Sequence, residues 1–148
     1  MSTAPLLALG ICLSLQGAPQ PLVVFIPGDR FTLAWTHSIE LQRWEEDYEV
    51  RPGPLPGTAF LHALAARVRG SAAGMEPPPD ARLVNGWYQY TPTETLPARL
   101  LLSRSAYVAD YERCDALQGC QPLAHWLPSD GGVTELTACM RAVPAIDR

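Results

Sequence analysis

The sequence contains no lysine, and all 11 of its basic residues are arginines. With 15 acidic residues the net charge is −4, and no block of basic residues occurs, which argues against a nucleic-acid-binding protein. The absence of lysine also excludes a phosphate-binding P-loop of the Gly-Lys type. No apolar run reaches the roughly 18 residues that a membrane-spanning helix needs, so no spanning helix is expected.

Long helices are not favoured either, because 15 prolines and 11 glycines in 148 residues predict many turns. The clearest local signal is Asn85-Gly86, the preferred two-residue hairpin turn, between two β-prone arms. Further strands are expected at residues 100–102, 107–111 and 133–139. We therefore predict an all-β fold, an antiparallel sandwich or a partly open barrel built from hairpins, with at most one short helix.

The apolar stretch at residues 5–15 has two interpretations. A secretory signal begins with positive charge, whereas the first basic residue here is Arg30, and residues 15–18 match a cleavage site poorly. The alternation of Ile11, Leu13 and Leu15 with Cys12, Ser14 and Gln16 favours a strand instead.

Four cysteines allow three pairings. Cys114 and Cys120 flank a turn-like segment, so two extended arms would bring their sulfurs together, and Cys12 and Cys139 would remain for a second bridge. Disulfides would place the protein in an oxidising compartment, the periplasm or cell envelope, whereas four reduced cysteines would be typical of a cytoplasmic protein. No Cys-x-x-Cys spacing occurs, so a metal site on the cysteines is not expected.

The main candidate site lies in a predicted hairpin at residues 30–50. A four-residue loop at residues 40–43 would place His37 opposite Glu46, on the apolar face that also carries Trp35. Such a pair could perform acid–base chemistry or bind a ligand, or it could be a buried polar pair that only fixes the strand register.

The other face of this hairpin is acidic. Glu45, Asp47 and Glu49 would share it with Thr36 and Ser38, and hard cations bind such oxygen atoms. The spacing is not that of an EF-hand, so we predict neither a metal nor a cofactor. Ser38 is not expected to act as a nucleophile with the preceding histidine, because neighbours on a strand point to opposite faces.

Several segments resemble the bacterial family named domain of unknown function 1850. They are residues 31–40, 44–48, 67–78, 81–87 and 114–123. Residues 61–69 fit a helix or a strand by their own pattern, and the resemblance favours the strand. We expect one domain over residues 1–148. It has a family-like core at 30–139, leading strands or a weak signal-like segment at 1–29, and a tail at 140–148.

The resemblance implies a context rather than a reaction. Members are small proteins often encoded beside TAXI-type TRAP transporters, which move organic solutes using ion gradients. The implied function is an extracytoplasmic accessory or ligand-binding β domain, with the TRAP-type permease or its solute-binding protein as partner. The alternatives are a small enzyme using His37 and Glu46, or a purely structural envelope protein. The candidate binding residues are Trp35, His37, Ser38, Glu40, Trp44, Glu45 and Glu46.

Overall fold

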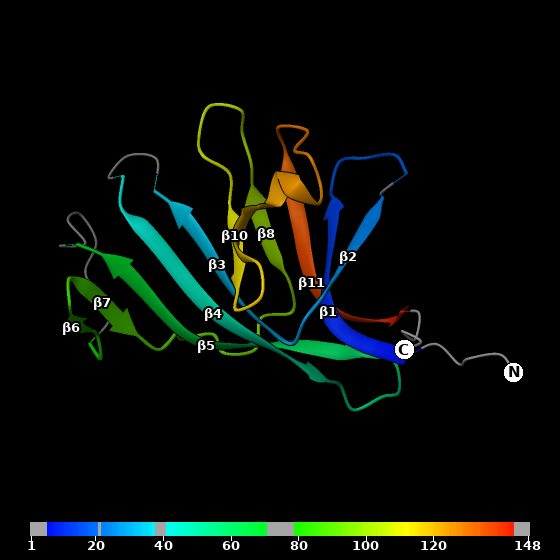
Figure 1. Ribbon diagram of the computed structural model, residues 1–148, viewed down its shortest axis with the longest axis horizontal. Helices are drawn as coiled ribbons and strands as arrows, with labels where there is room; N and C mark the ends of the chain where they lie inside the picture. The colour runs from blue at the N-terminus through cyan, green and yellow to red at the C-terminus, as the bar shows by residue number, and fades with distance from the viewer. Residues whose placement is uncertain (1–5, 21, 38–40, 71–78, 144–148) are drawn as a thin grey trace, which may run out of the picture.

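The computed structural model describes residues 6–20, 22–37, 41–70 and 79–143, which form two packed antiparallel sheets (Figure 1). The strands are β1 (Leu6–Leu15), β2 (Val23–Pro27), β3 (Arg30–Thr36), β4 (Arg43–Pro52), β5 (Ala59–Arg69), β6 (Arg82–Val84), β7 (Trp87–Tyr90), β8 (Leu100–Ser103), β9 (Glu112–Asp115), β10 (Gly119–Pro122) and β11 (Val133–Val143). A short 3-10 helix, η1 (Leu123–His125), follows β10. The predicted all-β fold is confirmed, as a sandwich rather than a closed barrel.

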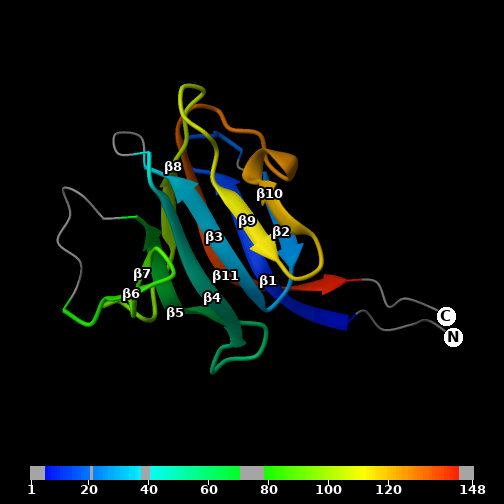
Figure 2. The same ribbon diagram turned by 60° about the vertical axis from the view of Figure 1, so that its left-hand side comes forward.

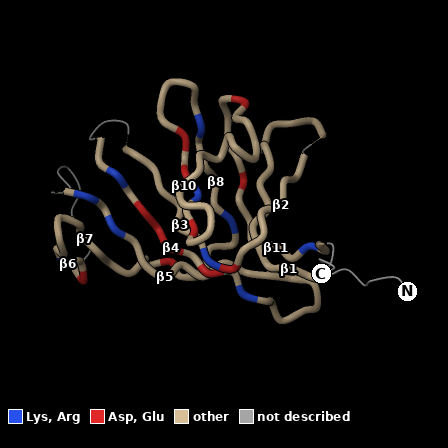
Figure 3. Tube along the Cα trace, in the orientation of Figure 1, with Lys and Arg blue, Asp and Glu red and all other residues tan. Residues whose placement is uncertain are grey.

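The smaller sheet has the strand order β2-β1-β11-β8. Its central pair, β1 and β11, is in register from Leu6 opposite Val143 to Leu15 opposite Thr134. Residues 6–15 therefore form a strand, as their alternation predicts, and β11 continues past residue 139 into the segment expected to be a tail. Figure 3 shows that β1 and β2 carry no charged side chain, which suits strands that supply much of the core.

The larger sheet has the order β10-β9-β3-β4-β5-β7-β6. The Asn85-Gly86 turn joins β6 to β7 with φ of 51° and 86° at its two residues, as that hairpin type requires. Residues 59–69 form β5, so the prediction of an extended segment there is confirmed.

The strand predicted at residues 107–111 is wrong, because β9 begins only at Glu112. The preceding loop is held by the buried Arg104, which donates hydrogen bonds to Asp110, to Thr134 and to the carbonyl of Leu127. These bonds to side chains and to a distant carbonyl fix residues 104–110 without strand pairing.

The core lies between the sheets, where β4 and β5 pass across β1 and β11 (Figures 1 and 2). Both sheets contribute side chains that are almost completely buried: Ile11, Leu13, Leu33, Val50, Leu61 and Leu136. Towards the Arg43 end of β4, the inner face changes from aliphatic side chains to Glu46 and aromatic rings, and the candidate site begins there.

Candidate functional site

The β3–β4 hairpin has a different register from the predicted one. Glu46 lies opposite Leu33, and the N–H of His37 donates to the carbonyl of Gln42 at 2.9 Å, which closes the loop. The predicted loop at residues 40–43 would have placed His37 opposite Glu46, whereas Leu33, four residues earlier in the chain, occupies that position. The predicted loop is therefore wrong. His37 is displaced from the position opposite Glu46 by roughly 13 Å along the strand.

The physical reason is aromatic packing across the hairpin. Trp35 pairs with Trp44, and their rings stack with centroids 6.1 Å apart. The loop also needs a positive φ, which Leu41 adopts at 56°. Because no glycine or asparagine marks that position, the sequence does not signal where the bend lies.

Glu46 is the polar residue of the inner face of β4. Its carboxylate accepts a hydrogen bond from the hydroxyl of Tyr48 at 2.9 Å. Burial raises the pKa of Glu46 above its ordinary value, and the hydrogen bond from Tyr48 only partly opposes that rise. Burial and the nearby carboxylate in turn raise the pKa of Tyr48, so the phenol keeps its proton.

Glu46 contributes to the lining of two cavities. The first has a volume of about 300 Å³, and its lining includes Tyr48, Tyr90, Glu94 and Leu100. The second has a volume of about 280 Å³, and its lining includes Trp35, Arg99 and Tyr111. An ionisable group with a shifted pKa in the lining of cavities that also contain aromatic residues is the arrangement expected of a small-molecule site.

Replacing Glu46 with glutamine is expected to make stability less dependent on pH. A carboxyl whose pKa is higher in the folded than in the unfolded state does not change the free energy of unfolding below its unfolded pKa of about 4.3. Above that pH it lowers the free energy of unfolding, and the loss grows as the pH rises. The charged and titratable groups facing it are Tyr48, Tyr90, Tyr111, Glu94 and Arg99. The variant should therefore gain stability relative to wild type as the pH rises from about 4 through the raised pKa of Glu46, by about 1.4 kcal/mol for each tenfold change in proton affinity. Urea unfolding at several pH values measures this gain, and equal pH profiles would contradict the assignment.

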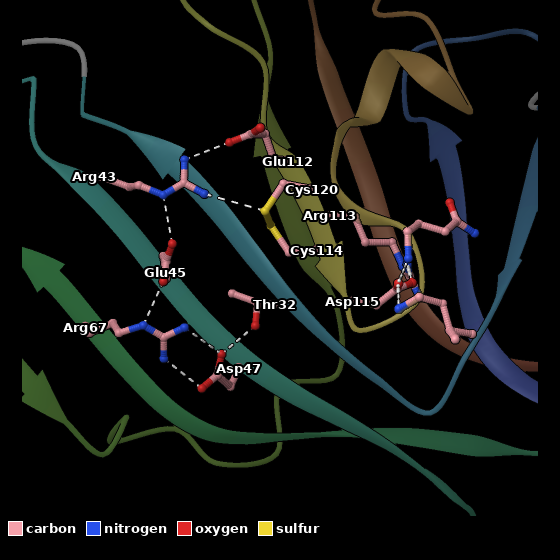
Figure 4. Close-up of a disulfide and its surroundings, with 12 residues drawn as sticks. Thr32, Arg43, Glu45, Asp47, Arg67, Glu112, Arg113, Cys114, Asp115 and Cys120 are labelled. Carbon is pink, nitrogen blue, oxygen red and sulfur yellow. Dashed lines mark hydrogen bonds and ion pairs between the residues drawn. A yellow bond between two sulfur atoms is a disulfide. The ribbon is translucent and has the colours of Figure 1, made fainter.

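The outer face of β4 carries a ladder of charges instead (Figure 4). Arg43 pairs with Glu45 and Glu112, and Arg67 bridges Glu45 and Asp47 at 2.7 and 2.8 Å. Burial alone would raise the pKa of Asp47, but hydrogen bonds from Arg67 and Thr32 outweigh it and leave that pKa lowered.

The ladder occupies carboxylate oxygens of the acidic face that a cation would need. Glu45 and Asp47 already face guanidinium groups, and the oxygens of Asp47 accept hydrogen bonds from Arg67 and Thr32. Among the described residues, no three side chains of His, Cys, Asp or Glu come together as metal ligands would.

Arg67→Ala is expected to lower the free energy of unfolding by roughly 1.5–3 kcal/mol at neutral pH, because it removes charged hydrogen bonds from two half-buried carboxylates. Asp47 has a lowered pKa, so its stabilisation is present above its unfolded pKa of about 4 and is lost as the pH falls through its folded pKa. The loss caused by Arg67→Ala should therefore shrink in acid. Arg82→Ala, at an exposed position, is the control and should have little effect.

The structure separates the candidate binding residues. Trp35 and Glu46 line the second cavity, and Trp44 stacks on Trp35. Glu45 lies on the opposite face within the ladder, and His37 is half-buried at the end of β3. Ser38 and Glu40 lie outside the described residues.

Sequence reasoning missed Tyr90, Tyr111 and Arg99 as cavity residues. A signal existed only for Tyr90. It lies opposite Ala66, which itself lies opposite Glu46, so extending the registers from the Asn-Gly hairpin would have placed it on the same face. Tyr111 and Arg99 lie outside the strands, and their positions depend on long-range packing.

Both predicted cysteine pairs lie at disulfide distance. Cys114 is directly opposite Cys120 across β9 and β10, as the hairpin interpretation requires. Cys12 and Cys139 join the neighbouring strands β1 and β11, with their Cα atoms 6.0 Å apart. The second pair therefore ties together segments from the two ends of the chain.

These features define a two-sheet antiparallel β protein with a half-buried carboxylate that lines two cavities containing aromatic residues. The chain belongs to the family described as domain of unknown function (DUF1850), whose model matches residues 31–123. That span includes the β3–β4 hairpin and the Cys114–Cys120 pair, and it ends before β11. No curated protein and no solved structure matched the chain. In the described part of the chain, no helix has the length and apolar character needed to cross a membrane.

Proposed function

We propose that this protein is a non-enzymatic, ligand-binding β domain that acts outside the cytoplasm as an accessory of a TRAP-type solute transporter. The observation that carries the binding role is Glu46, a half-buried carboxylate that contributes to the lining of two cavities with aromatic residues. Desolvating an ionisable group has a free-energy cost, and such groups are concentrated at functional sites.

The compartment is proposed from the cysteines. Two pairs at disulfide distance support an oxidising environment, such as the periplasm or cell envelope. The link to a TRAP-type permease or its solute-binding protein comes from the genomic context that the family resemblance implies.

The enzyme alternative has lost its geometric support. It required His37 and Glu46 to face one another, whereas Leu33 occupies the position opposite Glu46. Glu46 instead accepts a hydrogen bond from a phenol whose pKa is raised, which suits binding better than proton transfer near neutral pH.

Two experiments in the native host test this proposal. Tagged protein purified from membranes and periplasm should recover the neighbouring permease or its solute-binding protein. Deleting the gene should lower uptake of the transported solute, and wild-type protein should restore it better than Glu46→Gln does. Glu49→Gln, on the outer face of the same strand, is the matched control and should restore uptake fully. Recovery of neither partner together with normal uptake in the deletion strain would refute the proposal.

A further inference from the structure

The four carboxylates of β4 do not share the same surroundings. Three lie on the outer face and pair with arginines: Glu45 with Arg43 and Arg67, Asp47 with Arg67, and Glu49 with Arg30 and Arg51. Within the described residues, none of the chain's ion pairs reaches Glu46, whose carboxylate meets only the hydroxyl of Tyr48. Glu46, the carboxylate on the inner face of the strand, therefore lacks the arginine partner that each of the three outer carboxylates has.

Aromatic residues line both cavities to which Glu46 contributes. Trp35 and Tyr111, whose ring centroids are 5.9 Å apart, line the second cavity, and Trp44 stacks on Trp35 from outside its lining. Tyr48 and Tyr90 line the first cavity, together with Glu46. The faces of tyrosine and tryptophan rings carry negative potential and attract cations within about 6 Å.

The first cavity also contains a second carboxylate, Glu94, and its remaining lining includes Pro92, Pro97 and Leu100. The arginine near Glu46, Arg99, lines the other cavity, is half exposed, and is paired with Glu135 at 3.3 Å. The first cavity is thus acidic and aromatic, with apolar surface beside the acidic groups. Its volume of about 300 Å³ is at the lower end of the range for small-molecule sites.

We propose that the cavity formed by Glu46, Tyr48, Tyr90 and Glu94 binds the ammonium end of a small organic cation. Glu46 supplies the opposite charge, the tyrosine rings supply cation–π contact, and the prolines with Leu100 cover the apolar part of the ligand. This inference rests on the proposed binding function and specifies its ligand class.

Binding of this kind is linked to protons. A cation beside Glu46 favours the ionised carboxylate, whereas burial favours the protonated form in the free protein. The ligand should therefore bind more tightly as the pH rises through the raised pKa of Glu46, and binding should release a proton around that pH. Tyr48 and Tyr90 have raised pKa values and do not titrate there.

Three probes of similar size and different charge test the inference: butylammonium, butyrate and 1-butanol. Each is titrated into the full-length, oxidised protein and followed by calorimetry and by ¹H–¹³C spectra of the tyrosine rings. Butylammonium should bind saturably and perturb Tyr48 and Tyr90. Its dissociation constant should rise at least tenfold in Glu46→Gln and stay unchanged in Glu49→Gln.

Tyr90→Leu provides a second test that leaves Glu46 in place, and it should weaken butylammonium binding several-fold by removing one ring face. The inference is overturned if butylammonium does not bind, or if it binds Glu46→Gln as tightly as wild type. Tighter binding of butyrate or butanol in this cavity would overturn the cation assignment but leave the proposed binding function standing. Failure of that function itself would appear as unchanged solute uptake in the deletion strain.

Discussion

Replacing Cys12 and Cys139 with alanine is expected to lower the free energy of unfolding by about 5 kcal/mol, because the bridge closes a loop of 127 residues in the unfolded chain. The same change at Cys114 and Cys120, which are six residues apart, should cost only about 2 kcal/mol. The difference follows from loop-closure entropy, which grows with the logarithm of loop length.

The native environment adds to this difference. Cys12 and Cys139 are buried, so alanine also leaves unfilled volume around the pair. Urea unfolding of the two double variants, compared with wild type in oxidising buffer, gives both values. Reducing the wild-type protein should destabilise it by about as much as the two double variants combined. Equal losses of unfolding free energy for the two pairs would contradict the account in which the Cys12–Cys139 disulfide joins β1 to β11 and closes the longer loop.

Arg113→Ala is expected to cost about 3–5 kcal/mol, because it truncates a buried side chain that packs in the core and removes its ion pair with the half-buried Asp115. The side chain is 1% exposed and pairs with Asp115 (Figure 4). Its guanidinium lies 5.8 Å from the ring centres of both Phe31 and Trp126, so it also contributes cation–π contact and packing within the core.

The planar shape of the guanidinium matters in this position. Arg113→Lys keeps the charge but cannot keep the same contacts with two rings and a carboxylate, so it should recover only part of the stability. Arg141→Ala, at an exposed position on β11, is the control and should change stability by less than about 0.5 kcal/mol. Thermal unfolding of the three variants compares these effects. A loss below about 1 kcal/mol for Arg113→Ala would mean that this arginine is solvated.

Much of the fold follows from local patterns. The alternation in residues 6–15, the Asn85-Gly86 turn and the pairing of Cys114 with Cys120 all depend on short-range geometry, and the structure confirms each of them. Segment 107–111 has β-forming residues but is a loop, because the buried Arg104 anchors it from outside. Such tertiary anchoring has no local signature.

The hairpin register shows why the site could be predicted only in part. The predicted and observed registers differ by an even number of residues, and side chains alternate with a period of two. Each residue therefore kept its predicted face: Glu46 is on the inner side with Trp35, and Glu45 is on the outer side. The residue opposite Glu46 differs from the prediction: it is Leu33 on β3 and not His37. Tyr111 and Arg99 then complete the site from outside the strands.

The most direct test of the account is the titration of Glu46, followed by ¹³C NMR of its side-chain carboxyl in wild-type protein and in His37→Ala. We expect a pKa above the ordinary glutamate value in both proteins, falling when butylammonium is added. A pKa at or below the ordinary value, moving when His37 is replaced, would show instead that the carboxylate is solvated or paired with the imidazole, and the proposed site would be wrong.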